Sequence, residues 1–327
     1  MKKVALITGV TGQDGSYLSE FLLKKGYKVI GLYRRSSSDS KNKLKNIKHL
    51  LSNSKFVLFS GDVTDISSVM NVIGTYKPSE VYNLAAQSHV GESFTIPHTT
   101  METNGTGVLN VLEAIRLLDD NIRLYQASTS EMFGDLQAVQ NENTPFNPVS
   151  PYACSKVYAH NIVVNYRKAY NLFACCGILF NHESPRRGED FVTRKITKTA
   201  ARIHLGLEKE IRLGNIKTYR DWGYAGDYVE AMWSMLQQSE ADDFVISSNN
   251  SVTVEDFLEI VFKKLDMNYR DYLVIDKKFF RPHDVPYLRG DSTKAQKALG
   301  WKPKVDLEGL AEMMLEHDLR EARNEKK

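Results

Sequence analysis

The sequence predicts an α/β fold, in which a doubly wound parallel sheet carries helices on both faces and is joined to a smaller mixed α/β unit. Short β-rich runs alternate with amphipathic helical stretches in the first half of the chain. Several of these runs are apolar throughout, as expected for strands covered on both faces. The 327 residues also exceed the size at which a single core usually stops growing. We therefore expect a Rossmann-like domain with a second domain after it.

The predicted strands share β-branched and aromatic residues between polar turns, and they cover residues 3–9, 28–34, 55–62, 80–86, 123–129 and 172–180. Between them, segments such as 15–26 and 104–118 are apolar at three- and four-residue steps, which predicts helices. After residue 180 the regular alternation of predicted strands and helices is interrupted by a polar, loop-like run. We predict one domain over 1–180 and a second over 181–327, with segments around 216–248 returning to the first domain. The runs "EIRLGN" and "DFVISS" fit either domain.

The composition is that of an ordinary soluble protein, with 42% hydrophobic and 25% charged residues and a net charge of +3. The scattered basic residues predict no nucleic-acid partner. Cys154, Cys175 and Cys176 have no metal-ligand spacing; the adjacent pair predicts buried thiols, and the set excludes a disulfide scaffold. The apolar run at the N-terminus is too short for a signal peptide or a membrane span, so we predict a cytoplasmic protein without a metal or a membrane partner.

Glycines recur directly after the first predicted strand. Gly9, Gly12 and Gly15 in "LITGVTGQDGSYL" stand where the chain must turn tightly into the first helix. Glycine there lets the backbone approach a pyrophosphate, which the helix N-terminus stabilises. The position within a βαβ unit makes this a strong signal for a dinucleotide site. The Gly-x-x-Gly-x-x-Gly spacing resembles the short-chain dehydrogenase/reductase superfamily.

The end of the second strand indicates which dinucleotide binds. Arg34 and Arg35 stand where a cofactor with a free 2′-hydroxyl calls for an acidic residue, and Ser36 and Ser37 follow them. Guanidinium groups pair with a 2′-phosphate, so we predict NADP rather than NAD. Asp62, after the third strand, is either a partner for the adenine amine or a helix N-terminal cap.

A tyrosine and a lysine lie four residues apart in "SPYACSKVYAH". On a helix, Tyr152 and Lys156 share one face, and the ammonium group is expected to lower the pKa of the phenol, which makes Tyr152 a general base. This pattern also resembles the short-chain superfamily, in which a hydroxyl residue ahead of the tyrosine hydrogen-bonds the reacting oxygen. Thr129, at the tip of the fifth strand, is placed for that role.

A carboxylate follows two residues after this hydroxyl. Hydride transfer alone needs no such group, whereas removal of a carbon-bound proton next to a ketone needs a base. Thr129 and Glu131 supply a hydroxyl and a carboxylate at one strand tip. We predict that Glu131 is this base; an exposed loop acid is the alternative.

With these residues assembled, the chain closely resembles the GDP-mannose 4,6-dehydratase family of extended short-chain enzymes that modify nucleotide sugars. The resemblance runs nearly end to end and is carried by "TGQDGSYL", "VYNLAAQSHVGESF", "YQASTSEMFG", "SPYACSK", "NHESPRRGEDFVTRKI" and "RDWGYAGDYVEAMW". It implies that a GDP-linked hexose is oxidised at carbon 4, loses water across carbons 5 and 6, and is reduced at carbon 6. The hydride passes through tightly held NADP, which is regenerated.

The resemblance also implies further site residues. For the cofactor these are Gln13, Asp14, Val63, Leu84, Ala85 and Ala86, beside the glycines, Arg34, Arg35, Asp62, Tyr152 and Lys156. For the substrate they are Ser88 at the sugar, Lys195 near the guanine, Asp284 at the ribose, and Asn181, Arg220 and Arg281 at the diphosphate. The arginine-rich loop after strand two, with its "SSSDS" segment, is a candidate for assembly into a dimer or tetramer.

Two departures from the family pattern weaken the choice of mannose. His89 replaces an aromatic residue such as Phe beside the sugar pocket, and Asp284 replaces a longer Glu. A GDP-heptose is therefore the closest competing substrate. Two other functions use the same scaffold: a nucleotide-sugar epimerase or 4-ketoreductase, which Glu131 argues against, and a non-catalytic NADP-binding regulator, which is expected to have lost Tyr152, Lys156 or Glu131.

Overall fold

Seven parallel strands form the main sheet of the computed structural model, which describes residues 3–35, 44–136 and 138–326. The strand order is β10-β6-β5-β4-β1-β2-β3. The strands are β1 (Val4–Thr8), β2 (Lys28–Tyr33), β3 (Phe56–Ser60), β4 (Glu80–Asn83), β5 (Arg123–Thr129), β6 (Ala174–Leu179) and β10 (Phe244–Ile246). The first six confirm the predicted strands within a few residues, and the sheet confirms the α/β, Rossmann-like fold class.

Helices cover both faces of this sheet, because successive side chains of each strand point to opposite faces. Ala5 and Ile7 pack in one apolar cluster with α1 and α9, whereas Leu6 packs in another with α3, α6 and α7. The pattern explains why the strands are apolar throughout. The covering helices are α1 (Gln13–Lys24), α3 (Ile66–Tyr76), α6 (Gly107–Leu118), α7 (Pro151–Tyr170) and α9 (Ala225–Met235).

The adjacent cysteines illustrate the same alternation. Cys175 faces the cluster of α1 and α9, and Cys176 faces the cluster of α3, α6 and α7. Both are buried, as predicted, and burial raises the pKa of the Cys175 thiol to about 11.

Short elements lie between the main strands and helices. They are α4 (Val90–Ser93), α5 (Pro97–Met101), the π-helical turn Glu102–Thr106, and the 3₁₀ turns Lys45–Leu50 and Ser130–Phe133.

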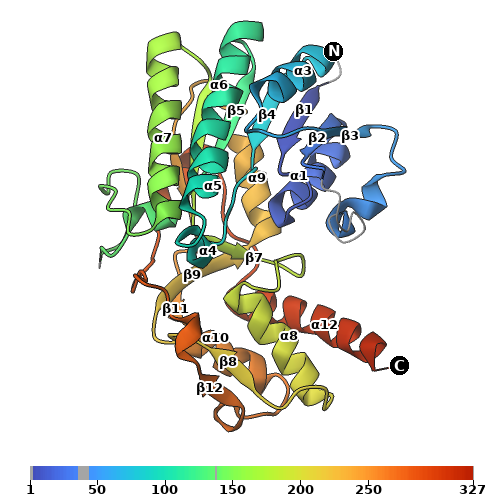
Figure 1. Cartoon of the computed structure of the whole chain (residues 1–327), viewed down its shortest axis with the longest axis vertical. Helices are drawn as coiled ribbons and strands as arrows, with labels where there is room; N and C mark the ends of the chain where they lie inside the picture. The colour runs from blue at the N-terminus through green and yellow to red at the C-terminus, as the bar shows by residue number, and fades with distance from the viewer. Residues whose placement is uncertain (1–2, 36–43, 137, 327) are drawn as a thin grey trace.

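The second layer is a smaller α/β unit, in the lower half of Figure 1. A three-stranded sheet has the order β11-β9-β7, and a two-stranded sheet pairs β12 with β8. Helices α8, α10 and α12 pack around a separate apolar cluster that includes Ile196, Phe257 and Met314. The elements are β7 (Asn181–Glu183), α8 (Val192–His204), β8 (Ile211–Leu213), β9 (Tyr219–Tyr224), β11 (Ser251–Thr253), α10 (Val254–Lys263), β12 (Leu273–Ile275) and α12 (Leu307–Glu325), with 3₁₀ turns at Tyr269–Asp271 and Lys277–Phe279.

The chain passes between the two layers more than once. After β9 it returns to the main sheet as α9 and β10, and later α11 (Thr293–Leu299) contributes Ala295 to the cluster of α1 and α9. Of the two runs that fitted either domain, "EIRLGN" contains β8 of the smaller unit and "DFVISS" contains β10 of the main sheet. Because β9 pairs with β7 and β11, the returning segment starts at α9 and not at residue 216.

No helix among the described residues is long and apolar enough to cross a membrane.

Candidate active site

A cleft of about 670 Å³ lies at the carboxyl ends of β1, β4, β5 and β6, between the sheet and the smaller unit. The strand order reverses between β1 and β4, which is where open α/β sheets bind ligands. Most of the predicted site residues line the cleft: Gly9, Gly12, Gln13, Asp14, Gly15, Leu84, Ala86, Ser88, Thr129, Glu131, Tyr152, Lys156, Asn181, Lys195, Arg220, Arg281 and Asp284. Arg34, Arg35, Asp62, Val63 and Ala85 lie outside the lining.

The glycine-rich turn is a close-packed backbone cradle. Gly9 has φ +66°, and a Cβ atom there would lie 2.8 Å from the Ala85 nitrogen. A Cβ at Gly15 would lie 2.5 Å from the Gly9 oxygen. Gly12 precedes α1, whose first N–H groups have no side-chain cap among the described residues, and Gly12, Gln13, Asp14 and Gly15 line the cleft. This arrangement fits the pyrophosphate of a dinucleotide, because backbone N–H groups and the helix N-terminus both favour an anion.

Gln13 and Asp14 join this turn to the smaller unit. His182 of β7 lies 2.7 Å from the Asp14 carboxylate, and the Gln13 amide donates to the His182 carbonyl. Ser184 donates to the Gln13 side-chain oxygen. Burial lowers the pKa of His182, but the Asp14 carboxylate outweighs it and the net pKa is raised. Both predicted residues thus line the cleft while their side chains hold β7.

The end of β2 brings Arg34 and Asp62 together at long range. Arg34 is exposed, and its Nε lies 3.9 Å from the Asp62 carboxylate. Asp62 accepts from the amide and the hydroxyl of Thr64, and the N-terminal cap of α3 is Asp65. The helix-cap alternative for Asp62 is therefore wrong, because three residues lie between Asp62 and Ile66, the first residue of α3. Arg35 is also exposed, and Ser36, Ser37 and the "SSSDS" segment lie outside the described residues.

Thr129, Tyr152 and Lys156 meet where β5 and α7 approach each other. The Lys156 ammonium donates to the Ala127 carbonyl at 2.9 Å and lies 5.9 Å from the centre of the Tyr152 ring. Ser150 caps α7 and Pro151 occupies its first turn, which fixes where the helix begins and hence which face Tyr152 presents.

The electrostatics of this cluster differ from the prediction. Burial raises the pKa of Tyr152 to about 12, although a hydrogen bond from Thr129 lowers it; the charge of Glu131 raises it further. Burial also lowers the pKa of Lys156 to about 8. The expectation that the Lys156 ammonium lowers the pKa of Tyr152 is wrong for the protein without a ligand, because burial penalises the charged forms of both side chains.

Glu131 begins a chain of alternating charges that crosses the cleft. It follows Thr129 in a 3₁₀ turn and is 6% exposed, so the alternative of an exposed loop acid is wrong. The Arg281 Nη1 atom lies 3.7 Å from its carboxylate and 3.3 Å from Asp284. Asp284 in turn lies 3.0 Å from Arg220. Asp284, predicted at the ribose, is thus the shared partner of the two arginines predicted at the diphosphate.

The remaining predicted substrate residues line the same end of the cleft. Lys195, on α8, lies 3.5 Å over the ring of Phe279, and burial lowers its pKa. Asn181 carries a buried side-chain oxygen that has no hydrogen-bond partner among the described residues. Ser88 lies in the loop after β4, and His89 next to it caps α4 and contacts the edge of Phe191.

Sequence reasoning missed several residues that line the cleft. They are His182, Arg187, Asp190, Phe279 and Phe280. The run "NHESPRRGEDFVTRK" did indicate this region, but its polar composition gave no means of separating the residues that face the cleft. Arg187, for example, lies 3.2 Å from Glu183 and 3.6 Å over the Phe191 ring.

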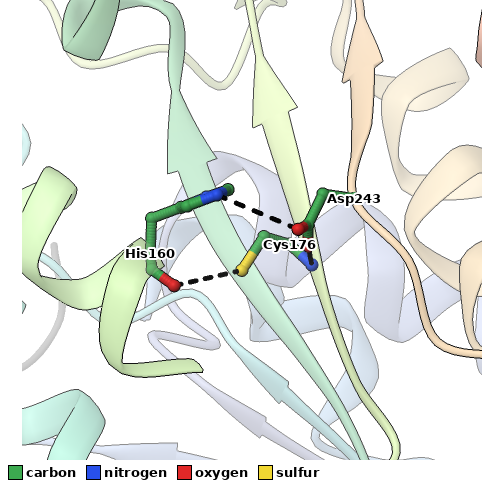
Figure 2. Close-up of side chains that lie close together, drawn as sticks. All are labelled: His160, Cys176 and Asp243. Carbon is green, nitrogen blue, oxygen red and sulfur yellow. Dashed lines mark hydrogen bonds and ion pairs between the residues drawn. The ribbon is translucent and has the colours of Figure 1, made fainter. Parts of the chain in front are cut away.

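A second cluster of polar side chains lies behind the tip of β5. His160 Nδ1 lies 3.1 Å from the Ser128 hydroxyl, and its Nε2 lies 3.9 Å from Asp243, beside Cys176 (Figure 2). The side chains of His160, Cys176 and Asp243 have the ligand types of a metal site. However, Arg167 pairs with Asp243, and burial raises the pKa of Cys176 well above its usual range. A neutral thiol and an already neutralised carboxylate are poor metal ligands.

The chain is similar throughout to known proteins. A family model described as GDP-mannose 4,6 dehydratase matches residues 6–314. GDP-mannose 4,6 dehydratase 1 of Arabidopsis thaliana is 54% identical, and the match covers 99% of this chain and 92% of that one. GDP-mannose 4,6-dehydratase of Vibrio cholerae is 47% identical, and the match covers 98% of this chain and 95% of that one. The Homo sapiens protein of the same name is 46% identical, and the match covers 97% of this chain and 92% of that one.

Solved structures of similar fold are nucleotide-sugar enzymes. A Bacillus anthracis dTDP-glucose 4,6-dehydratase in complex with NAD has a TM-score of 0.84 at 24% identity, covering 99% of this chain and 98% of that one. A Thermus thermophilus UDP-glucose 4-epimerase complex with NAD has a TM-score of 0.82 at 25% identity, covering 96% and 98%. The similarity of this chain to these structures supports the fold, whereas the sequence matches identify the family. This chain belongs to the GDP-mannose 4,6-dehydratase family.

Proposed function

We propose that this protein is a lyase that converts GDP-D-mannose to GDP-4-keto-6-deoxy-D-mannose with loss of water. One observation carries the proposal: the carboxylate of Glu131 and the hydroxyl of Thr129 lie at one strand tip, in the same cleft as Tyr152 and Lys156. The family membership supports a GDP-linked sugar as the substrate.

The first proton transfer is assigned to Tyr152. Its phenolate takes the proton from the sugar 4-hydroxyl, while the Thr129 hydroxyl hydrogen-bonds the same oxygen. Because the protein alone leaves the Tyr152 pKa at about 12, the base needs a further positive charge nearby. A nicotinamide dinucleotide, when bound, supplies both a hydride acceptor that returns its hydride within the same turnover and, in its oxidised form, a positively charged ring.

The second proton transfer is assigned to Glu131. Its carboxylate removes the proton from carbon 5, which the neighbouring 4-ketone makes acidic. The bond between carbon 6 and its hydroxyl then breaks, and the proton held by Glu131 is returned to that hydroxyl, which leaves as water. The stored hydride is returned to carbon 6, and carbon 5 takes up one proton, which balances the proton that Tyr152 took from the 4-hydroxyl. One water is therefore lost and no cofactor is consumed.

NADP is the proposed cofactor. Gly9, Gly12 and Gly15 are assigned to its pyrophosphate, with Arg34 and Arg35 at the 2′-phosphate. Both arginines are exposed at the end of β2, and Arg34 has only a distant ion-pair partner in Asp62. Replacing both arginines by alanine should weaken NADP binding about 100-fold and leave NAD binding nearly unchanged, as measured by calorimetric titration.

The family matches do not favour the competing substrate, a GDP-heptose, that the departures at His89 and Asp284 left open. Incubation of the purified protein with GDP-mannose, and in parallel with GDP-heptose, separates the two. The 4-keto product should form from GDP-mannose without added NADPH and without net change in cofactor absorbance. Stoichiometric loss of NADPH would contradict the dehydratase assignment and support a reductase.

The role of Glu131 has its own test. Glu131→Gln should lower kcat by about 1,000-fold while the variant still binds the cofactor and oxidises carbon 4. Full turnover by this variant would refute the assignment.

The larger organisation is also a proposal. We assign residues 1–180, with α9 and β10, to cofactor binding and the rest of 181–327 to GDP-sugar binding. Assembly into a dimer or tetramer and a cytoplasmic location stay predictions; light scattering at several concentrations tests the first.

A further inference from the structure

We propose that Arg281 is an exchangeable counterion: it pairs with Glu131 in the free protein and leaves it for the diphosphate of the incoming substrate. Substrate binding thereby frees the base that the reaction needs. The inference rests on the proposed function and adds to it a coupling between the diphosphate and Glu131.

The two arginines of the charge chain are held very differently. Arg220 is 6% exposed, and its Nη1 donates at 2.8 Å both to the Tyr219 carbonyl and to the Val285 carbonyl. Two backbone carbonyls and Asp284 fix its position. By contrast, the Arg281 side chain is 33% exposed, and its partners among the described residues are the carboxylates of Glu131 and Asp284. Arg281 can therefore move without leaving a backbone carbonyl unpaired.

The pair with Glu131 is loose. The 3.7 Å separation between Arg281 Nη1 and the Glu131 oxygen exceeds hydrogen-bonding distance, whereas Arg281 is closer to Asp284, at 3.3 Å. Asp284 is itself held by Arg220 at 3.0 Å. Asp284 thus keeps Arg281 at the cleft while its contact with Glu131 breaks. A diphosphate offers several anionic oxygens and a bidentate geometry, and so competes well for a guanidinium group.

The coupling predicts a reciprocal effect on binding. If GDP must take Arg281 from Glu131, then removing the Glu131 charge removes that cost and tightens GDP binding. GDP is the appropriate probe because it carries the diphosphate but no sugar for Glu131 to act on. For a partly exposed ion pair we expect about threefold tighter binding in Glu131→Gln.

A double-mutant cycle separates this coupling from simple charge repulsion. GDP affinity is measured by calorimetry for the wild type, Glu131→Gln, Arg281→Gln and the double variant. Glu131→Gln should tighten binding in the presence of Arg281 and have little effect in its absence. Glu92→Gln is the matched control, because Glu92 also lines the cleft and has no ion-pair partner within 4.0 Å among the described residues. Glu131→Ala, which also removes the charge, repeats the test should Glu131→Gln fail to fold.

Each outcome bears on the proposal. Tightening that depends on Arg281 supports it. Equal tightening in Glu92→Gln, or the same effect of Glu131→Gln with and without Arg281, overturns it and leaves the dehydratase assignment intact. Failure of the wild type to bind GDP at all would overturn both this inference and the proposed substrate class.

Discussion

At the glycine-rich end of the cleft, backbone atoms form the binding surface, whereas at the opposite end charged side chains form it. Because Gly9 and Gly15 leave no room even for a Cβ atom, the backbone surface that they form is close-packed and rigid. Arg220, Arg281, Asp284 and Glu131 pair with one another, and in the proposal above Arg281 exchanges its partner. The contrast suits the two ligands. Under the proposed function, the rigid cradle suits a cofactor that stays bound, and the charges that can be re-paired suit a substrate that enters and leaves.

Gly15→Ala should produce the largest effect, because it introduces a Cβ atom 2.5 Å from the Gly9 oxygen, where only backbone can move away. We expect a loss of about 2–4 kcal/mol of stability and at least about a 100-fold loss of dinucleotide affinity. Thermal unfolding and cofactor titration measure both. Gly74→Ala in α3 is the control: a Cβ there meets nothing within 4 Å, so stability should rise by about 0.5 kcal/mol. Equal effects of the two would show that the cradle is not rigid.

Lys156, beside Tyr152, should make the stability of the protein depend on pH. Its pKa falls from 10.5 to about 8 in the folded protein, so between these values the unfolded chain binds more protons and stability rises with pH. The rise should reach about 3 kcal/mol by pH 10. Above that, Tyr152 acts in the opposite sense, because its pKa is raised to about 12 and the unfolded chain loses its proton first. Urea unfolding of Lys156→Met should lack the rise between pH 8 and 10; an unchanged pH profile would show that Lys156 is solvated.

Asp14→Asn tests the junction between the two ends. The raised pKa of His182 contributes stability that is full below pH 6.5 and is lost as pH rises through the folded value. The lowered pKa of Asp14 contributes stability that is full above 3.8 and is lost on acidification. Asp14→Asn should therefore cost about 2 kcal/mol near pH 6 and less near pH 9. Thermal melts at the two pH values check this, and a loss independent of pH would point to packing alone.

The smallest expected effects are those of conservative substitutions at Arg220 and Arg281, which should differ between the two arginines. Arg220→Lys leaves one or both carbonyls at Tyr219 and Val285 without a donor and should cost about 1–2 kcal/mol. Arg281→Lys should change stability by less than about 0.5 kcal/mol and appear mainly as a higher KM. Unfolding and steady-state kinetics on both variants distinguish a fixed from an exchangeable arginine, and a larger stability loss for Arg281→Lys would reverse their roles.

Local patterns predicted the strands, the glycine turn and the Tyr152–Lys156 pair, because each depends on residues a few positions apart. The contacts of His182 with Asp14 and of Arg281 with Glu131 could not be predicted in this way. Asp14 and His182 are 168 residues apart in the chain and meet only because β1 and β6 end at the same edge of the sheet. The pKa of Tyr152 was mispredicted for a related reason: helical spacing indicates which groups are neighbours and says nothing about how deeply both are buried.

The repeated passage of the chain between its two layers has a consequence for protein engineering. The segment from α9 to β10 is encoded inside the smaller unit, yet β10 forms the edge of the main sheet beside β6. A chimaera that exchanges the smaller unit between family members at a single splice near residue 180 would therefore also exchange that edge strand and α9, which packs on α1. Recombination that preserves the main sheet and its covering helices needs further junctions, on both sides of the segment from α9 to β10 and around α11.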